Sequence, residues 1–226
     1  MNLRRYLIVL VVLLAAGVAT LIATLVLAPF GTSSSGGNDV SETRSVSGFD
    51  RIRLEGAFTT SITAGVPRTR VVVSGTQDAV ARVTAEVQGD TLVVGQRSGF
   101  DPFGRPPKVE ISLPALRGLA NSGTGSTNIS GLTGSDIEIE NAGAGSIVAS
   151  GTAGREDVSL NGVGKIDTTE LDAHDVTVDS NGVGAVHVRA NGSLKMNLNG
   201  VGEVRYAGTP SHVESQVSGI GKIGRL

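Results

Sequence analysis

The chain has 226 residues, with 19 lysines and arginines against 21 aspartates and glutamates and a formal net charge of −2. Because the two signs are mixed along the chain, nothing in it favours binding to nucleic acid or to an anionic membrane surface. The sequence contains no cysteine, which excludes disulfide bonds, thiolate zinc sites and lipid attachment through an N-terminal cysteine.

The first predicted element is a membrane-spanning or signal helix over residues 1–28. Arg4 and Arg5 precede the apolar stretch Tyr6–Leu27, which carries no charge. Such a helix would be roughly 33 Å long, enough to cross the hydrocarbon core of a bilayer. The arginines predict that this end stays in the cytoplasm and that the rest is exported. Pro29 is a poor residue to follow a cleavage site, so an uncleaved signal anchor is favoured over a cleaved signal peptide.

Residues 29–45 are rich in glycine, serine and threonine, which predicts a flexible linker. Residues 46–114 follow with six short runs in which apolar residues alternate with polar ones. Ile52 and Leu54 form the first run, and turn residues separate the runs from one another. These runs predict an N-terminal β region, either a sheet or irregular first coils, that caps one end of a repeat array.

Residues 115–226 carry a phrase of two glycines separated by one residue, and it occurs six times. The pairs are Gly123/Gly125, Gly143/Gly145, Gly162/Gly164, Gly182/Gly184, Gly200/Gly202 and Gly219/Gly221, so the second glycines are 20, 19, 20, 18 and 19 residues apart. Apolar residues alternate with polar ones on both sides of each pair, as in a strand with one buried face. We therefore predict an all-β fold, a single-stranded right-handed parallel β-helix of about six coils with about 20 residues per coil.

Several segments resemble a known family. They are Phe49–Gly56, Val71–Gly75, Gly89–Val94 and the later repeats, in which serine or asparagine precedes the glycine pair. Residues 46–226 resemble the putative auto-transporter adhesin, head GIN domain family. The resemblance implies an exported bacterial protein of the cell envelope with a β-helical fold and a role in adhesion, and it supplies no catalytic residue. Many members are lipoproteins, so this cysteine-free chain must be attached differently.

Asn161, Asn181 and Asn199 each stand directly before a glycine pair. Stacked coils should place the three amides in one row at the corner formed by Gly162, Gly164, Gly182, Gly184, Gly200 and Gly202. We interpret this row as a structural corner, because asparagine tolerates turn geometry and amides can satisfy one another. The alternative is a row of amides that binds a glycan.

Asp167, His187 and Arg205 each stand three residues after the second glycine of their coil. They share the outward parity, so we expect an exposed row in which acid, imidazole and guanidinium are neighbours. No nucleophile is placed beside the histidine, so the row is not a catalytic triad. His174 and His212 occupy other positions of the repeat, which argues against a metal site.

The loop Arg97–Lys108 is the predicted contact surface, because it holds Phe100, Phe103 and Arg105 among three prolines. Alternatively, both phenylalanines fold back over the core. The last coil ends without a recognisable cap, so an exposed strand edge could pair two copies of the chain.

The sequence therefore predicts a non-enzymatic, membrane-anchored envelope protein that binds an unknown glycan or protein, without a cofactor. Two alternatives stay open, a purely structural spacer and a polysaccharide lyase or hydrolase. The enzyme would require clustered carboxylates, and the candidates are Asp167, Asp172, Asp175 and Asp179.

Overall fold

The computed structural model describes residues 39–97, 104–134 and 136–226. The predicted helix over residues 1–28, together with Phe100 and Phe103, lies outside these ranges. In the described ranges no helix has the length and apolar character needed to span a bilayer. Within the compact unit of residues 38–226, the described residues are almost entirely β-structure and include one short helix, α2 (Gln77–Arg82).

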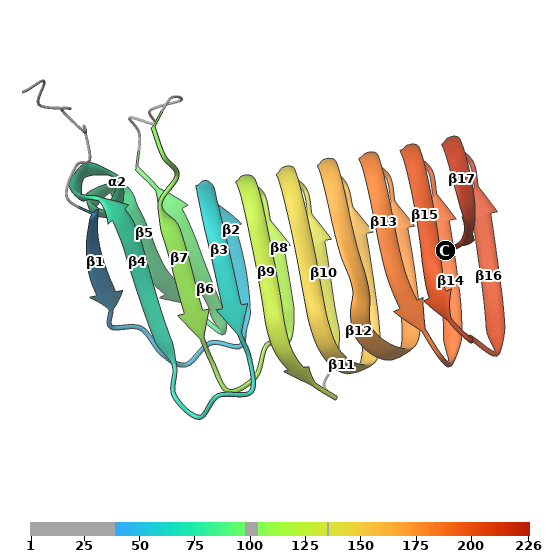
Figure 1. The fold of residues 1–226 in the computed structure, drawn as a ribbon, viewed down its shortest axis with the longest axis horizontal. Coiled ribbons are helices and arrows are strands. Elements are labelled where there is room, and N and C mark those ends of the chain that lie inside the picture. The colour runs from blue at the N-terminus through green and yellow to red at the C-terminus, as the bar shows by residue number, and fades with distance from the viewer. Residues whose placement is uncertain (1–38, 98–103, 135) are drawn as a thin grey trace, which may run out of the picture. The chain divides into compact units, whose positions relative to one another are not determined.

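The strands form two faces joined at a corner that carries the glycine pairs (Figure 1). The first face contains β5 (Val83–Gln88), β6 (Thr91–Gln96), β2 (Arg51–Glu55), β8 (Gly118–Asn121), β10 (Ile137–Asn141), the second halves of β11 (Ala144–Leu160) and β12 (Val163–Ser180), β14 (Ser193–Leu198) and β16 (His212–Val217). The second face contains β1 (Asp39–Arg44), β4 (Arg70–Thr76), β7 (Lys108–Ser112), β3 (Ala57–Thr63), β9 (Thr124–Thr133), the first halves of β11 and β12, β13 (Val183–Ala190), β15 (Val201–Gly208) and β17 (Ile220–Arg225).

From β8 to β17 the chain forms a parallel β-solenoid of about five turns. The glycine spacing predicted about six coils. The difference arises because six corners enclose five complete repeats, and the first and last corners each border an incomplete one. The predicted all-β solenoid is confirmed.

Coils near the N-terminus do not stack in chain order. The coil β2–β3 lies between β6–β7 on one side and β8–β9 on the other, with Ile52 opposite both Leu92 and Leu119. The chain leaves the stack after β3, passes through β4, α2 and β5, and returns to place β6 and β7 outside β2 and β3. Strands β4 and β5 pair antiparallel to β7 and β6, which ends the parallel stack at this end.

The expected linker over residues 29–45 is wrong in its last part. Strand β1 begins at Asp39 and pairs antiparallel with β4 through Arg44. The polar composition of this segment indicated a linker, but β1 lies at the sheet edge, where only Val40 and Arg44 are partly covered. An edge strand can remain polar because one side faces water.

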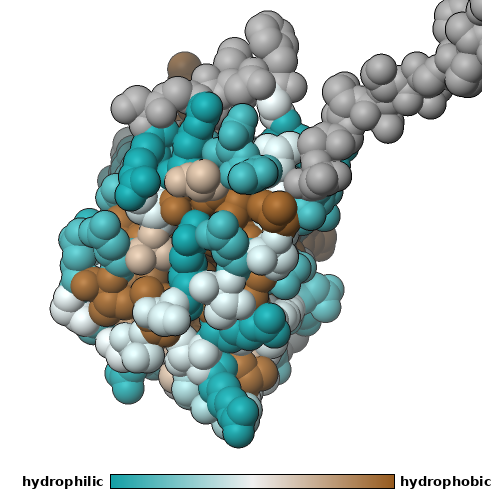
Figure 2. All heavy atoms as spheres, turned by 90° about the vertical axis from the view of Figure 1, so that its left-hand side faces the viewer, coloured by the Kyte–Doolittle hydropathy of each residue, from teal (hydrophilic) through white to brown (hydrophobic). Residues whose placement is uncertain are grey.

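A cap closes the N-terminal end of the stack. Thr76 caps the N-terminus of helix α2, since its hydroxyl accepts a hydrogen bond from the N–H of Ala79, and the helix buries Val80 completely. Viewed from this end, hydrophilic and pale residues lie between the hydrophobic ones (Figure 2).

The core consists of inward side chains stacked in columns from coil to coil. Ile147, Ile166, Val186 and Val204 are in register and fully buried, two residues after the second glycine of each repeat. Apolar burial of this kind, about 25 cal/mol per Å² of surface removed from water, drives folding. The alternation seen in the sequence thus becomes the inner surface of the solenoid.

Glycine is required at the corner because neighbouring coils approach closely there. A Cβ atom added at Gly164 would lie 1.8 Å from the carbonyl oxygen of Gly145, and Gly164 has a φ of +147°. No side chain fits at that separation, and the left-handed backbone favours glycine. The same crowding recurs along the corner, so the glycines hold the coils in register.

Candidate binding surface

A groove of about 720 Å³ follows the second face beside the glycine corner. Its floor is backbone from successive coils at Gly125, Gly145 and Gly164. Because these positions have no side chain, a ligand lying there could approach the peptide groups themselves. We call this feature the glycine groove.

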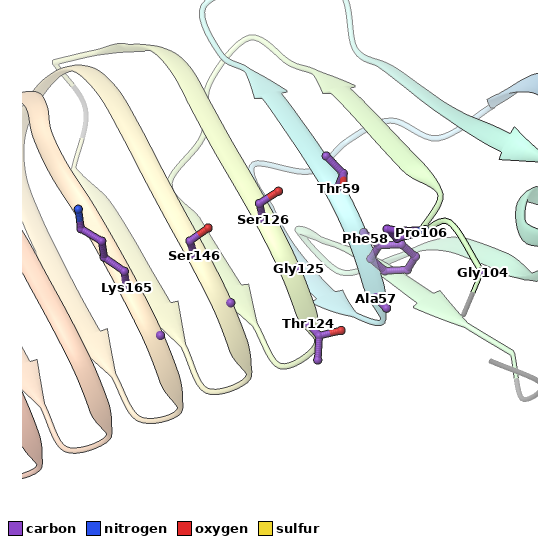
Figure 3. A pocket seen from close by; sticks show the side chains of 12 residues that line it. Ala57, Phe58, Thr59, Gly104, Pro106, Thr124, Gly125, Ser126, Ser146 and Lys165 are labelled. Atoms are coloured by element: carbon purple, nitrogen blue, oxygen red, sulfur yellow. The ribbon is translucent and has the colours of Figure 1, made fainter. Parts of the chain in front are cut away.

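Side chains of different kinds border the glycine groove (Figure 3). Ser126, Ser146 and Lys165 are in register on consecutive coils and form its polar side. Phe58 and Pro106 form one end, and Phe58 occupies the register position that glycine takes in the next coil. The groove thus combines two hydroxyls, one ammonium group and apolar surface.

An exposed apolar row continues along the same corner beyond the groove. Val163, Val183, Val201 and Ile220 occupy the position between the two glycines, are in register, and are 56%, 49%, 46% and 76% exposed. Scattered exposed valines are ordinary, but four in one straight row make a continuous apolar strip. This strip widens the surface available to an extended ligand.

The three asparagines of the repeat lie in one row beside that strip. The amide of Asn181 donates to Asn161 Oδ1 at 3.0 Å, and that of Asn199 donates to Asn181 Oδ1 at 2.9 Å. Asn161 donates to Glu140 Oε1 at 3.1 Å. Each amide therefore already has a partner within the protein, which is the arrangement of a structural corner.

Asp167, His187 and Arg205 are also neighbours, in register on the second face. His187 Nδ1 lies 3.9 Å from Asp167 Oδ2, whereas Arg205 reaches Glu203, with its Nε 3.1 Å from Oε2. The other His187 nitrogen, Nε2, is 3.6 Å from Glu203 Oε1. Glu203 thus joins the row between the histidine and the arginine.

The pKa values of two acids in this row are shifted. Burial alone would raise the pKa of Asp167, but hydrogen bonds from Lys165 and Thr169 outweigh it, so this pKa lies below its usual value. A hydrogen bond from Arg205 lowers the pKa of Glu203. Both acids are therefore held as carboxylates, and the row is a network of compensated charge.

The predicted contact loop borders the groove. Its described residues Gly104 and Pro106 line one end, and Arg105 has a 76% exposed side chain with Nη1 3.8 Å from Asp39 Oδ2. An ion pair this exposed contributes little to stability, so Arg105 remains available to solvent and to ligands.

The four aspartates considered for polysaccharide chemistry do not converge. Asp167 is on the second face and Asp179 is on the first, in register with Ser159 and Asn197. Asp172 and Asp175 lie between them in the long strand β12, where Asp175 accepts from Ser193. Within the described ranges no group of three or more histidine, cysteine, aspartate or glutamate side chains is arranged to hold a metal ion.

Glu156 is a site that sequence reasoning missed. It occupies a core column in which the neighbouring coils place Ile137, Val176 and Leu194, and its exposure is 0%. Neither carboxyl oxygen has a hydrogen-bond partner among the described residues. The repeat frame could have revealed it, because a single glutamate interrupts an apolar position that recurs every 18 to 20 residues.

Burial raises the pKa of Glu156 to about 8. The hydroxyl of Thr168 lowers this pKa, but its effect is smaller than that of burial. The same hydroxyl donates a hydrogen bond to the carbonyl oxygen of His187, 3.4 Å away. The carboxyl is therefore protonated and neutral at pH 7.

The model of the family described as putative auto-transporter adhesin, head GIN domain, matches residues 48–210. The chain belongs to this family. The match covers most of the N-terminal cap, from residue 48 on, and most of the repeats, so the resemblance seen in the sequence is confirmed. None of the curated proteins matches this chain.

A solved structure shares the fold of this head GIN domain protein. A putative adhesin from Bacteroides fragilis is 24% identical, with a TM-score of 0.70 over 83% of this chain and 97% of its own. A putative adhesin from Parabacteroides distasonis is 19% identical, with a TM-score of 0.45 over 84% and 98% of the two chains. A protein from the same species described as a putative lipid binding protein is 20% identical, with a TM-score of 0.43 over 84% and 97%.

Proposed function

We propose that this protein is a non-enzymatic, adhesin-like module of the bacterial cell envelope, and that it holds an envelope glycan or protein along the glycine groove. The observation that carries the proposal is the groove itself. Its floor exposes backbone that no side chain covers, Ser126 and Ser146 offer hydroxyls, and the apolar strip beside it offers apolar contact. Extended polymers are bound by such repeated, mixed surfaces on solenoids.

Attachment to the membrane is part of the same proposal. Residues 1–28 contain the uncharged apolar stretch that follows Arg4 and Arg5, and they would hold the solenoid on the exported side of the membrane. The described solenoid would then face the envelope as a binding surface.

The separation of the four aspartates argues against the alternative of a polysaccharide-active enzyme. Glycoside hydrolysis uses two carboxyl groups on opposite sides of one bond, held about 5 to 10 Å apart. Asp167 and Asp179 lie on opposite faces, and the core separates them.

The test is retention of residues 39–226 on fractions of the bacterial cell envelope. These residues belong to one compact unit and can be produced without the apolar segment. The fractions are compared untreated, after protease digestion and after periodate oxidation of sugars. Loss of retention after protease alone identifies a protein ligand, and loss after periodate alone identifies a glycan.

Two variants locate the binding surface. Ser146→Trp fills the groove, whereas Ser159→Trp places the same bulk on the first face, and both serines are half-buried outward residues. We expect Ser146→Trp to abolish retention and Ser159→Trp to preserve it, with similar melting temperatures. Failure of the unmodified protein to bind any fraction would refute the adhesin-like function.

A further inference from the structure

The two ends of the described solenoid differ in how the core is covered. Helix α2 and antiparallel strands close the N-terminal end (Figure 1), and Val80 of the helix is fully buried. At the other end β16 and β17 are the outermost strands. There, Val213 and Val217 stack on the core residues Leu194 and Leu198 but remain 42% and 47% exposed.

Among the described strands, neither β16 nor β17 has a neighbour on its outer side, so the backbone groups there have no partner strand in this part of the chain. In β16, the N–H of Ser218 just after the strand donates back to the carbonyl oxygen of Leu198, so alternation directs those of Glu214 and Gln216 the same way. The peptide groups of Val213, Ser215 and Val217 then face the open edge. In β17 the N–H groups of Ile220 and Leu226 point back, which leaves those of Gly221, Ile223 and Arg225 on the open edge.

We propose that a second copy of this chain covers the open coil and forms a two-fold symmetric dimer. In this dimer β16 pairs antiparallel with β16 of the second copy, and β17 pairs antiparallel with β17. Such a contact uses the same surface on both partners and closes after two copies, whereas a contact between opposite ends would continue into a filament. The proposal is independent of the ligand held in the glycine groove.

The side chains of β16 favour this pairing because their order reads alike in both directions. With the two-fold axis at Ser215, Val213 faces Val217 of the second copy, and Glu214 faces Gln216. The inward valines would cover one another, and no like charges would be opposed. The peptide groups of Val213, Ser215 and Val217 on the open edge would exchange the hydrogen bonds.

Strand β17 fits the same axis. With Ile223 opposite Ile223 of the second copy, Lys222 faces Gly224 and Arg225 faces Gly221. Each long cation thus meets a glycine, which leaves it room and avoids direct repulsion. Ile223 stacks on the buried Val204, so the pairing would complete this core column as well.

Light scattering of residues 39–226 tests the association. We expect twice the monomer mass at high protein concentration and dissociation on dilution over about a hundredfold range. The double variant Val213→Lys with Val217→Lys should be a monomer. Val183→Lys is the matched control, because Val183 is 49% exposed on the corner strip away from the open end, and it should remain a dimer.

Single cysteines test the register, and the cysteine-free sequence makes this test clean. Two Ser215→Cys residues on the axis would form a hydrogen-bonded pair with Cα atoms about 5.5 Å apart, within disulfide reach. Mild oxidation should therefore link Ser215→Cys into a covalent dimer. Gln216→Cys is offset from the axis and should link more slowly, and Ser159→Cys, far from the open end, measures random collision.

Three results would overturn the proposal. The first is a monomer at every concentration, with Ser215→Cys linking no faster than Ser159→Cys. The second is faster linking of Gln216→Cys, which would refute the stated register. The third is a dimer that survives the two lysines but is lost in Val183→Lys, which would place the contact elsewhere.

Discussion

Replacement of Glu156 by glutamine should remove a pH dependence of stability that originates in the core. The carboxyl of Glu156 has a pKa of about 8 in the folded protein, against an ordinary value of 4.5. Between these values the folded state keeps the proton and the unfolded chain releases it. Stability must therefore fall as the pH rises through this interval, and it levels off above about pH 8.

The magnitude follows from the two pKa values. A gap from 4.5 to about 8 corresponds to about 5 kcal/mol between the acidic and alkaline limits, or roughly 1.4 kcal/mol for each pH unit. Glutamine has nearly the same shape and does not ionise. The advantage of Glu156→Gln over the natural chain should thus grow from below about 1 kcal/mol at pH 5 to about 4 kcal/mol near pH 8.

The assay is denaturant unfolding followed by circular dichroism, repeated at each pH from 5 to 9. Glu86→Gln serves as the control, because Glu86 is an exposed glutamate of strand β5, and its effect should not vary in this way. A constant difference between Glu156→Gln and the natural chain across the pH range would show that the buried carboxyl does not control stability. The reasoning from burial would then be refuted.

Three further predictions concern the repeats. Gly164→Ala should lower the melting temperature strongly, since its Cβ would lie 1.8 Å from a carbonyl oxygen of the preceding coil, whereas Gly224→Ala, with no atom closer than 3.7 Å, should change it little. Asn181→Ala breaks two side-chain hydrogen bonds of the asparagine row and should cost about 1 kcal/mol in denaturant unfolding, and no change would mean that the row is not stabilising. The pKa of Asp167 is lowered in the folded state, so the stability that its carboxylate contributes is lost as the pH falls through that pKa. Asp167→Asn should therefore flatten the acid side of the curve of stability against pH. An unchanged curve would contradict this prediction.

The candidate surface was only partly predictable from the sequence. The spacing of Asn161, Asn181 and Asn199 was enough to place them in one row, because equal repeats stack in register. The glycine groove was not predictable, since it arises where side chains are missing and where Phe58 and Pro106 close one end from distant parts of the chain. Glu203 was likewise missed as the partner of His187, because the two residues are distant in sequence and only the stacking of the coils brings Glu203 Oε1 to 3.6 Å from His187 Nε2.

The sequence by itself determined the solenoid and the inner column that contains Ile147, Ile166 and Val186, because a repeat of 18 to 20 residues and alternating polarity are local properties of the chain. Only the tertiary structure decided that the coil β2–β3 lies between β6–β7 and β8–β9, and that β1 belongs to the cap. Strands with the same alternation can pair in several orders, and the order depends on which edges meet after distant segments come together. The same physical reason applies to Glu156, whose charge suggests the surface until the coils above and below enclose it.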